Sequence, residues 1–216
     1  MRRHLVLLAT AALLVGTVVP ASAQGPPRME TEPISWHAQA TAVELGDGEV
    51  DGAYAHLRAT DSGASVTFRT HDLQPDHAYT LWFVVVNEPE ACDDEPCTAG
   101  DIFADGNPAA AQVLHGAGNI VGTSGRATFS AHLNAGDVDG WLDTVTFDDP
   151  RGAEYHFVLN DHGPRIAEHL PGMLHTYRGG CSDDSPFPGI FPETALQDGE
   201  PGPNTCLLTQ QAIFTP

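Results

Sequence analysis

Apolar and polar residues alternate with a period of two along much of the chain. In residues 53–59, apolar side chains alternate with polar ones, and residues 65–70 and 153–159 show nearly the same alternation. A period of two is typical of a strand that buries one face. Residues 79–86 are almost all apolar, which predicts a strand covered on both faces.

Three further stretches have strand-like patterns: residues 36–45, 113–121 and 127–133. Gly122-Thr123-Ser124-Gly125 lies between the last two and predicts a hairpin connection. The 22 Gly and 17 Pro residues argue against long helices, so we expect only a short helical turn, within 108–114 or 166–175. The chain is therefore predicted to be all-β, an antiparallel β-sandwich of about seven strands, with a closed β-barrel as the alternative.

The N-terminal segment differs from the rest of the chain. Two arginines precede an apolar run over residues 5–19, and the small residues Ala21-Ser22-Ala23 follow it. This order predicts a secretory signal peptide over residues 1–23, cleaved after Ala23. No later stretch is long and apolar enough to span a bilayer, so we expect a secreted, extracellular product without a membrane span.

The remaining chain shows no internal repeat and no shift in composition that would divide it. Residues 24–35 are rich in Pro and are predicted to form a loose lead-in. We expect residues 36–216 to form a single β-sandwich domain, in which a disulfide holds the C-terminal loop region. A chain of this length is ordinary for one all-β domain.

Charge restricts the partners that this protein can have. The chain has 9 Arg and no Lys against 29 Asp and Glu, for a formal net charge of -20. Such a chain repels phosphate backbones, so we expect no nucleic-acid partner. The charge favours a soluble monomer. The acids are concentrated in turns, which indicates that they solvate the surface and do not form a single binding surface. The charge does not identify an extracellular ligand.

Four cysteines agree with export. An even number in an exported chain predicts disulfides, for which three pairings exist. We expect the two pairs of nearest neighbours, Cys92 with Cys97 and Cys181 with Cys206. The alternative is a four-thiolate zinc site, but the Cys-x4-Cys and Cys-x24-Cys spacings differ from the usual Cys-x2-Cys pairs.

Histidines provide the first candidate site. His56, His132 and His156 each occupy the face of their strand opposite the small apolar face, and His162 follows the last of these strands. Neutral imidazoles that converge from neighbouring strands bind copper or zinc. The alternative is that they are separate residues on the solvent side, because the phase of a pattern does not set the order of strands.

Acidic turns provide the second. Asp47, Glu49 and Asp51 match the first half of a calcium loop, with Gly52 at the sixth position. The twelfth position is Arg58, where an EF-hand needs a bidentate Glu, so the segment is no EF-hand. A weaker calcium site remains a hypothesis, against the alternative that Asp-Gly pairs only form turns.

The strand that ends in Asp161-His162-Gly163-Pro164 is followed by Gly179-Gly180-Cys181. Together with the buried strand at 79–86 and the acidic loop between Cys92 and Cys97, this set resembles a group of uncharacterised secreted bacterial β-sandwich proteins. The resemblance covers about the central two-thirds of the chain. It implies a shared sandwich with no known activity, and it assigns no functional residue.

Enzyme motifs are absent from the sequence. It contains no Gly-x-Ser-x-Gly and no His-Glu-x-x-His, and without Lys it cannot form a phosphate-binding loop of the Walker type. We therefore expect a non-catalytic extracellular binding or envelope-associated module, with no cofactor. The alternatives are a copper- or zinc-binding protein that uses the four histidines and, third, a hydrolase built on residues 153–175.

Overall fold

The computed structural model describes residues 25–186 and 201–216 of the chain. The expected signal peptide, residues 1–23, lies outside the described residues. The strands are β1 (Arg28–Trp36), β2 (Glu49–Thr60), β3 (Gly63–Thr70), β4 (His77–Val86), β5 (Ala111–Ile120), β6 (Ala127–Asn134), β7 (Gly136–Val138), β8 (Val145–Phe147), β9 (Glu154–Pro164) and β10 (Leu207–Phe214). The helices are α1 (Ala38–Ala42), α2 (Ala99–Ile102) and α3 (Leu170–His175), with single 3-10 turns at Pro89–Ala91 and Ala167–His169.

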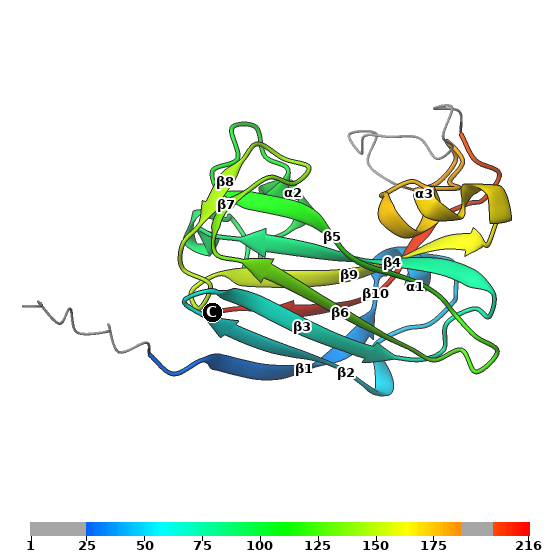
Figure 1. Cartoon of the computed structure of the whole chain (residues 1–216), viewed down its shortest axis with the longest axis horizontal. Helices are drawn as coiled ribbons and strands as arrows, with labels where there is room; N and C mark the ends of the chain where they lie inside the picture. Colours follow the sequence, from blue (N-terminus) through cyan, green and yellow to red (C-terminus); the bar gives the residue numbers. More distant parts are fainter. Residues whose placement is uncertain (1–24, 187–200) are drawn as a thin grey trace, which may run out of the picture.

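Eight of the strands form one antiparallel sheet in the order β5-β4-β9-β10-β1-β2-β3-β6. The sheet curls until its end strands, β5 and β6, approach each other, and β7 and β8 form a small separate ribbon (Figure 1). The all-β prediction is confirmed, and the sheet takes the nearly closed, barrel-like form that was the alternative to a sandwich. A sheet curled in this way has only two edge strands, which lie next to each other, whereas two separate flat sheets would expose the unpaired backbone groups of four.

The period-two pattern sets the core. Every second residue of β2, β3, β6 and β9 points into the barrel, where large apolar side chains pack together. Phe83 packs edge-to-face on Phe157 with ring centroids 4.8 Å apart, and Phe68 meets Phe129 in the same way at 6.5 Å. These rings are buried, so the interior is a packed core and not a channel.

The strand at 79–86 is covered on both faces, as its sequence predicts. The outer side of β4 carries Trp82, Val84 and Val86, all buried. Ile102 of α2 belongs to the apolar cluster that covers Val84 and Val86, and Tyr177 packs edge-to-face on Trp82. The outer face of β5-β4-β9-β10 is therefore a second packed layer, interrupted where these covering segments do not meet.

Two predictions at the start of the domain were wrong. Residues 28–35, expected in the loose lead-in, form most of β1, and Pro33 is tolerated there because the register with β2 shifts between Pro33 and Ser35. Residues 36–45 were expected to be a strand but contain α1. The side chain of His37 caps this helix by accepting a hydrogen bond from the backbone N–H of Gln39.

Other differences concern connections. The expected hairpin at residues 122–125 does not form, because β5 pairs with β4 and β6 pairs with β3, so this turn joins the two ends of the sheet. The helical turn expected within 166–175 is confirmed as α3. Strand β10, which the pattern did not reveal, inserts between β9 and β1 and completes the sheet.

Both predicted disulfides are present. Cys92 and Cys97 have Cα atoms 5.5 Å apart, and the Cα atoms of Cys181 and Cys206 are 5.3 Å apart. Because all four sulfurs are in disulfides, they cannot serve as the thiolates of a four-cysteine zinc site. No helix within residues 25–186 and 201–216 has the length and apolar character needed to cross a membrane.

Candidate functional site

A groove of about 740 Å³ lies on the outer face of the sheet, over β4, β9 and β10. Its floor is apolar, because the outward residues of these strands are large and uncharged at this level. The floor residues are Trp82, Val84, Val113, Val158, Leu208 and Ile213, and Ile102 and Phe103 add an apolar side. A concave apolar surface of this volume matches the usual site for a small molecule.

One wall of the groove is the acidic loop closed by Cys92 and Cys97. Asp101 holds this loop to α2, since its carboxylate accepts hydrogen bonds from the backbone N–H groups of Thr98 and Asp93, at 2.7 and 2.9 Å. These bonds, with the Thr98 hydroxyl, stabilise the ionised form and lower the pKa of the Asp101 carboxyl. Asp94 and Glu95 then stand on the rim of the groove.

The opposite wall is β10 with the start of α1. Gln39 joins the two, because its side-chain oxygen accepts from the backbone N–H of Leu208 at 2.9 Å and its amide donates to the Pro186 carbonyl at 2.7 Å. His37 lines the groove beside it, and burial lowers the pKa of His37. This wall therefore presents neutral polar groups, in contrast to the acidic rim opposite.

The polar centre of the groove is His156 with Glu154, two residues apart on the outer side of β9. His156 Nε2 lies 2.6 Å from Glu154 Oε1, which also accepts the backbone N–H of Cys97 at 2.8 Å. Glu154 is 1% exposed and His156 is 7% exposed. The buried carboxylate therefore fixes both the imidazole ring and the acidic loop.

This pairing determines which atom His156 offers to a ligand. An ionised carboxylate only accepts hydrogen bonds, so Nε2 carries the proton that points to Glu154. Within the described residues, Nδ1 has no hydrogen-bond partner, and His156 lines the groove. In the neutral ring, Nδ1 is an acceptor held in a fixed direction at the centre of an apolar surface.

Further along the same face of β9, the polar residues are fully buried. His162 Nδ1 donates to the Gly179 carbonyl at 2.8 Å, and Nε2 then accepts the Thr80 hydroxyl at 2.7 Å. Burial, more than any neighbouring charge, lowers the pKa of His162 from 6.5 to about 4. The residue fastens the segment before Cys181 to the sheet and offers nothing to a ligand.

The buried neutral state of His162 predicts a stability loss in acid. Between pH 6.5 and pH 4 the unfolded chain binds a proton that the folded chain does not, so the free energy of unfolding falls as pH falls, by up to roughly 3 kcal/mol. Urea unfolding at about pH 7 and about pH 4.5 measures this loss. In His162→Gln, which cannot titrate, the loss should be smaller by roughly 2–3 kcal/mol; an unchanged pH dependence would contradict the assignment.

The structure separates the four histidines named from the sequence. His56 and His132 do lie on the outer face, but β3 stands between their strands, and they hydrogen bond to Thr31 at 2.9 Å and Ser65 at 2.8 Å. His156 and His162 lie on β9, with β10 and β1 between them and β2. The outward phase assigned to His56, His132 and His156 agrees with the structure, but the strand order prevents one copper or zinc site.

Asp47, Glu49 and Asp51 also do not assemble. Asp47 lies between α1 and β2, where its carboxylate accepts the N–H of Gly48. The other two occupy alternate positions of β2, with roughly 7 Å between their Cα atoms. Across the described part of the chain, only one set of three ligand atoms is close enough for a metal, from His162, Cys181 and Cys206. Its two sulfurs are bonded to each other, so they are not the thiolates that zinc or copper require.

Sequence reasoning missed Glu154, His37 and Trp82. The only sequence signal for Glu154 was its place two residues before His156, on the same face of the strand. The structure adds that this face is buried, where an unpaired carboxylate is not tolerated. Trp82 was counted only as part of an apolar run. Comparison of the chain with protein-family models, with curated proteins and with solved structures finds no match.

Proposed function

We propose that this protein is a non-catalytic extracellular binding protein that holds a small amphipathic molecule in the groove over β4, β9 and β10. The observation that carries the proposal is the open Nδ1 of His156, fixed by a buried Glu154 within an apolar lining. An apolar site with few well-directed polar groups is the usual form of a small-molecule site.

The lining selects the ligand. Apolar contact on Trp82, Val158 and Leu208 favours a hydrocarbon body, and burying it supplies most of the binding free energy. His156 Nδ1 accepts a hydrogen bond, which favours a head group that donates one, such as a hydroxyl or an amine. Asp94 and Glu95 on the rim disfavour a carboxylate head.

Binding rather than catalysis is supported by the partners of His156. In residues 25–186 and 201–216, its ring hydrogen bonds only to Glu154, with no hydroxyl or thiol placed on it as a nucleophile. The two disulfides and the predicted signal peptide support an extracellular location.

Three ligands with the same alkyl chain test the proposal: decan-1-ol, decylamine and decanoate. We expect calorimetry to detect binding of the alcohol and the amine, and weaker binding of decanoate, because the rim is acidic. His156→Gln keeps a donor for Glu154 but loses the acceptor in the direction of Nδ1. It should therefore lower the affinity for decan-1-ol roughly tenfold.

A filled groove gives the second arm of the test. Val158→Phe extends a ring into the groove and should abolish binding of all three ligands. Val43→Phe is the matched control, because Val43 is 55% exposed and lies outside the groove. Equal loss in both variants, or equal affinity for decanoate and decan-1-ol, would refute the proposed site.

A further inference from the structure

The arginines of this protein fall into two groups, those that form ion pairs with carboxylates and those that do not. The described residues include seven arginines. Four of them form ion pairs with carboxylates: Arg28, Arg151, Arg165 and Arg178. Arg58, Arg69 and Arg126 have no ion pair with any described carboxylate, although the chain contains 29 acids against 9 arginines.

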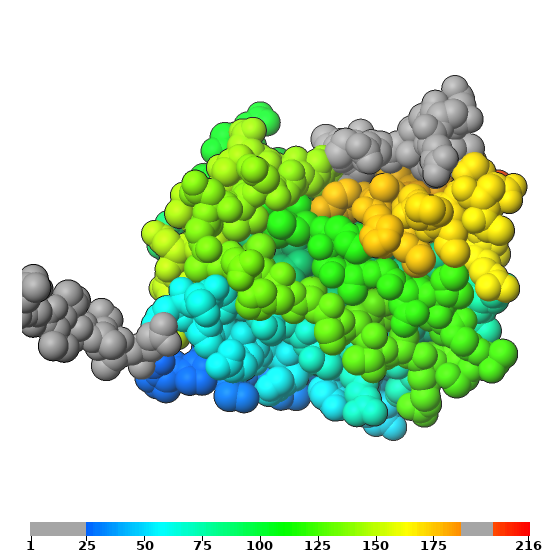
Figure 2. Space-filling view, viewed as in Figure 1, coloured from blue at the N-terminus to red at the C-terminus, as the bar shows by residue number. Residues whose placement is uncertain are grey.

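The three unpaired arginines lie on one surface, the outward side of β2, β3 and β6, called the cationic face here. Its cross-strand rows are Tyr54–Arg69–Thr128, His56–Thr67–Ser130 and Arg58–Ser65–His132. These nine residues include no carboxylate, and Arg126 directly precedes β6 in the same outward phase. Figure 2 shows the cyan residues of β2 and β3 adjoining the green residues of β6 on one continuous surface.

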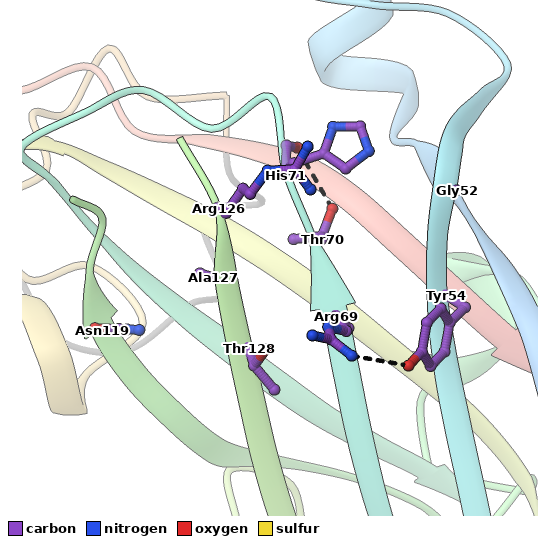
Figure 3. A pocket seen from close by; sticks show the side chains of 9 residues that line it. All are labelled: Gly52, Tyr54, Arg69, Thr70, His71, Asn119, Arg126, Ala127 and Thr128. Carbon is purple, nitrogen blue, oxygen red and sulfur yellow. Dashed lines mark hydrogen bonds between the residues drawn. The ribbon is translucent and has the colours of Figure 1, made fainter. Parts of the chain in front are cut away.

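One end of the cationic face is hollowed. A cavity of about 580 Å³ opens there, over β2, β3 and β6 and reaching Asn119 near the end of β5. Figure 3 shows Arg69 and Tyr54 joined across neighbouring strands, Thr128 on the next strand and Arg126 at its start. Because β5 and β6 are not hydrogen bonded to each other, the hollow lies where the barrel does not close.

The guanidinium groups in the hollow have donors to spare. Arg69 Nη1 donates to the Tyr54 hydroxyl at 3.3 Å, which leaves its other N–H groups open, and the side chain of Arg126 hydrogen bonds to no described residue. His71 at the top of the hollow is occupied, by the Asp51 carbonyl at 2.8 Å and the Asp72 carboxylate at 3.1 Å. Arginine forks of this kind match carboxylate oxygens.

Neutral hydroxyl and amide groups surround the charges. Thr128, Tyr54 and Asn119 line the hollow, and Ser and Thr continue along the face. Arg58 lies four residues along β2 from Tyr54, roughly 13 Å away. A ligand that uses the hollow and Arg58 together must be extended, carry several negative charges and present hydroxyl groups between them.

We propose that the cationic face binds a linear polysaccharide that carries carboxylate groups, with one carboxylate in the hollow between Arg69 and Arg126 and a later one on Arg58. The proposal is independent of the groove, which lies across the barrel over β4, β9 and β10. Attraction is local and is opposed by the net charge of the whole chain, so the interaction should be sensitive to salt.

Polygalacturonate is the probe, with galacturonate as the free sugar acid and dextran as the uncharged polymer. We expect polygalacturonate to bind, to lose at least roughly tenfold in affinity from about 50 mM to about 200 mM NaCl, and dextran not to bind. Arg69→Gln and Arg126→Gln should each weaken polymer and sugar acid roughly tenfold. Arg58→Gln should weaken the polymer and leave galacturonate unchanged.

Arg165→Gln is the matched control, since it removes the same charge from an arginine that is paired with Asp76 and belongs neither to the lining of the hollow nor to the cross-strand rows. An equal loss in this variant would reduce the effect to net charge and overturn the proposal. Tighter binding of duplex DNA than of polygalacturonate would also overturn it. A third contradicting result would come from sedimentation without polymer, if the chain formed a dimer that Arg69→Gln and Arg126→Gln abolish.

Discussion

Replacing Cys181 and Cys206 together by Ser is expected to lower the free energy of unfolding by about 3–4 kcal/mol, from loop entropy alone. The bridge closes 25 residues of sequence, and a longer closed loop restricts the unfolded chain more. The bridged residues also fix their surroundings, because Cys181 accepts the N–H of Gly202 at 2.7 Å and the N–H of Cys206 donates to Ser185 at 3.0 Å.

Urea unfolding at neutral pH measures this loss. The matched control is the double Ser variant at Cys92 and Cys97, where the separation is only 5 residues and about 2 kcal/mol is expected. The two variants should also differ in ligand binding. The bridge between Cys92 and Cys97 closes the loop that forms one wall of the groove, so its removal should lower the affinity for the ligand, whereas removal of the longer bridge should mainly lower stability. Equal losses of stability would show that loop entropy does not govern the longer bridge.

Replacing Glu154 by Ala is expected to cost about 2–6 kcal/mol of folding stability, because two buried donors each lose their acceptor at about 1–3 kcal/mol. The change leaves the N–H of Cys97 and the Nε2 proton of His156 without an acceptor inside the protein. Because both groups border the groove, ligand affinity should fall together with stability.

Two further variants separate these effects. Glu154→Gln keeps one oxygen that accepts hydrogen bonds, so it should recover about half of the lost stability. Glu90→Ala removes an exposed carboxylate near the same loop and should change the free energy of unfolding by less than about 0.5 kcal/mol. If Glu154→Ala behaves like Glu90→Ala in urea unfolding, the carboxylate does not anchor the groove.

The strands were predictable where burial is one-sided. Residues 53–59 and 65–70 show a strict alternation, and they form β2 and β3 with the expected faces. The C-terminal strand was not predicted, because Gln210 and Thr209 are polar yet buried, satisfied by hydrogen bonds such as that from Gln210 to the His71 carbonyl. A pattern of hydrophobicity does not reveal a buried polar residue whose partner is distant in the sequence.

The candidate sites were less predictable than the fold. His156 was selected by its phase, but its companions were taken to be His56 and His132, which lie across intervening strands. The residue that matters to His156 is Glu154, two positions away on its own strand. The arginines of the cationic face gave no signal at all, because their lack of partners is a property of the folded surface.

The all-β class and the buried face of the strongly alternating strands could be predicted from the chain alone, because they depend on local alternation. Both disulfides were among the three pairings that the sequence allowed, and the favoured pairing of nearest neighbours is the one that forms. The strand order, the near closure of the barrel and the positions of the groove and the hollow are properties of the folded chain. Strand order depends on pairings between distant segments, which a period of two does not encode. The groove and the cationic face arise from that order, because it places β4, β9 and β10 across the barrel from β2, β3 and β6 on the outer face of the same sheet.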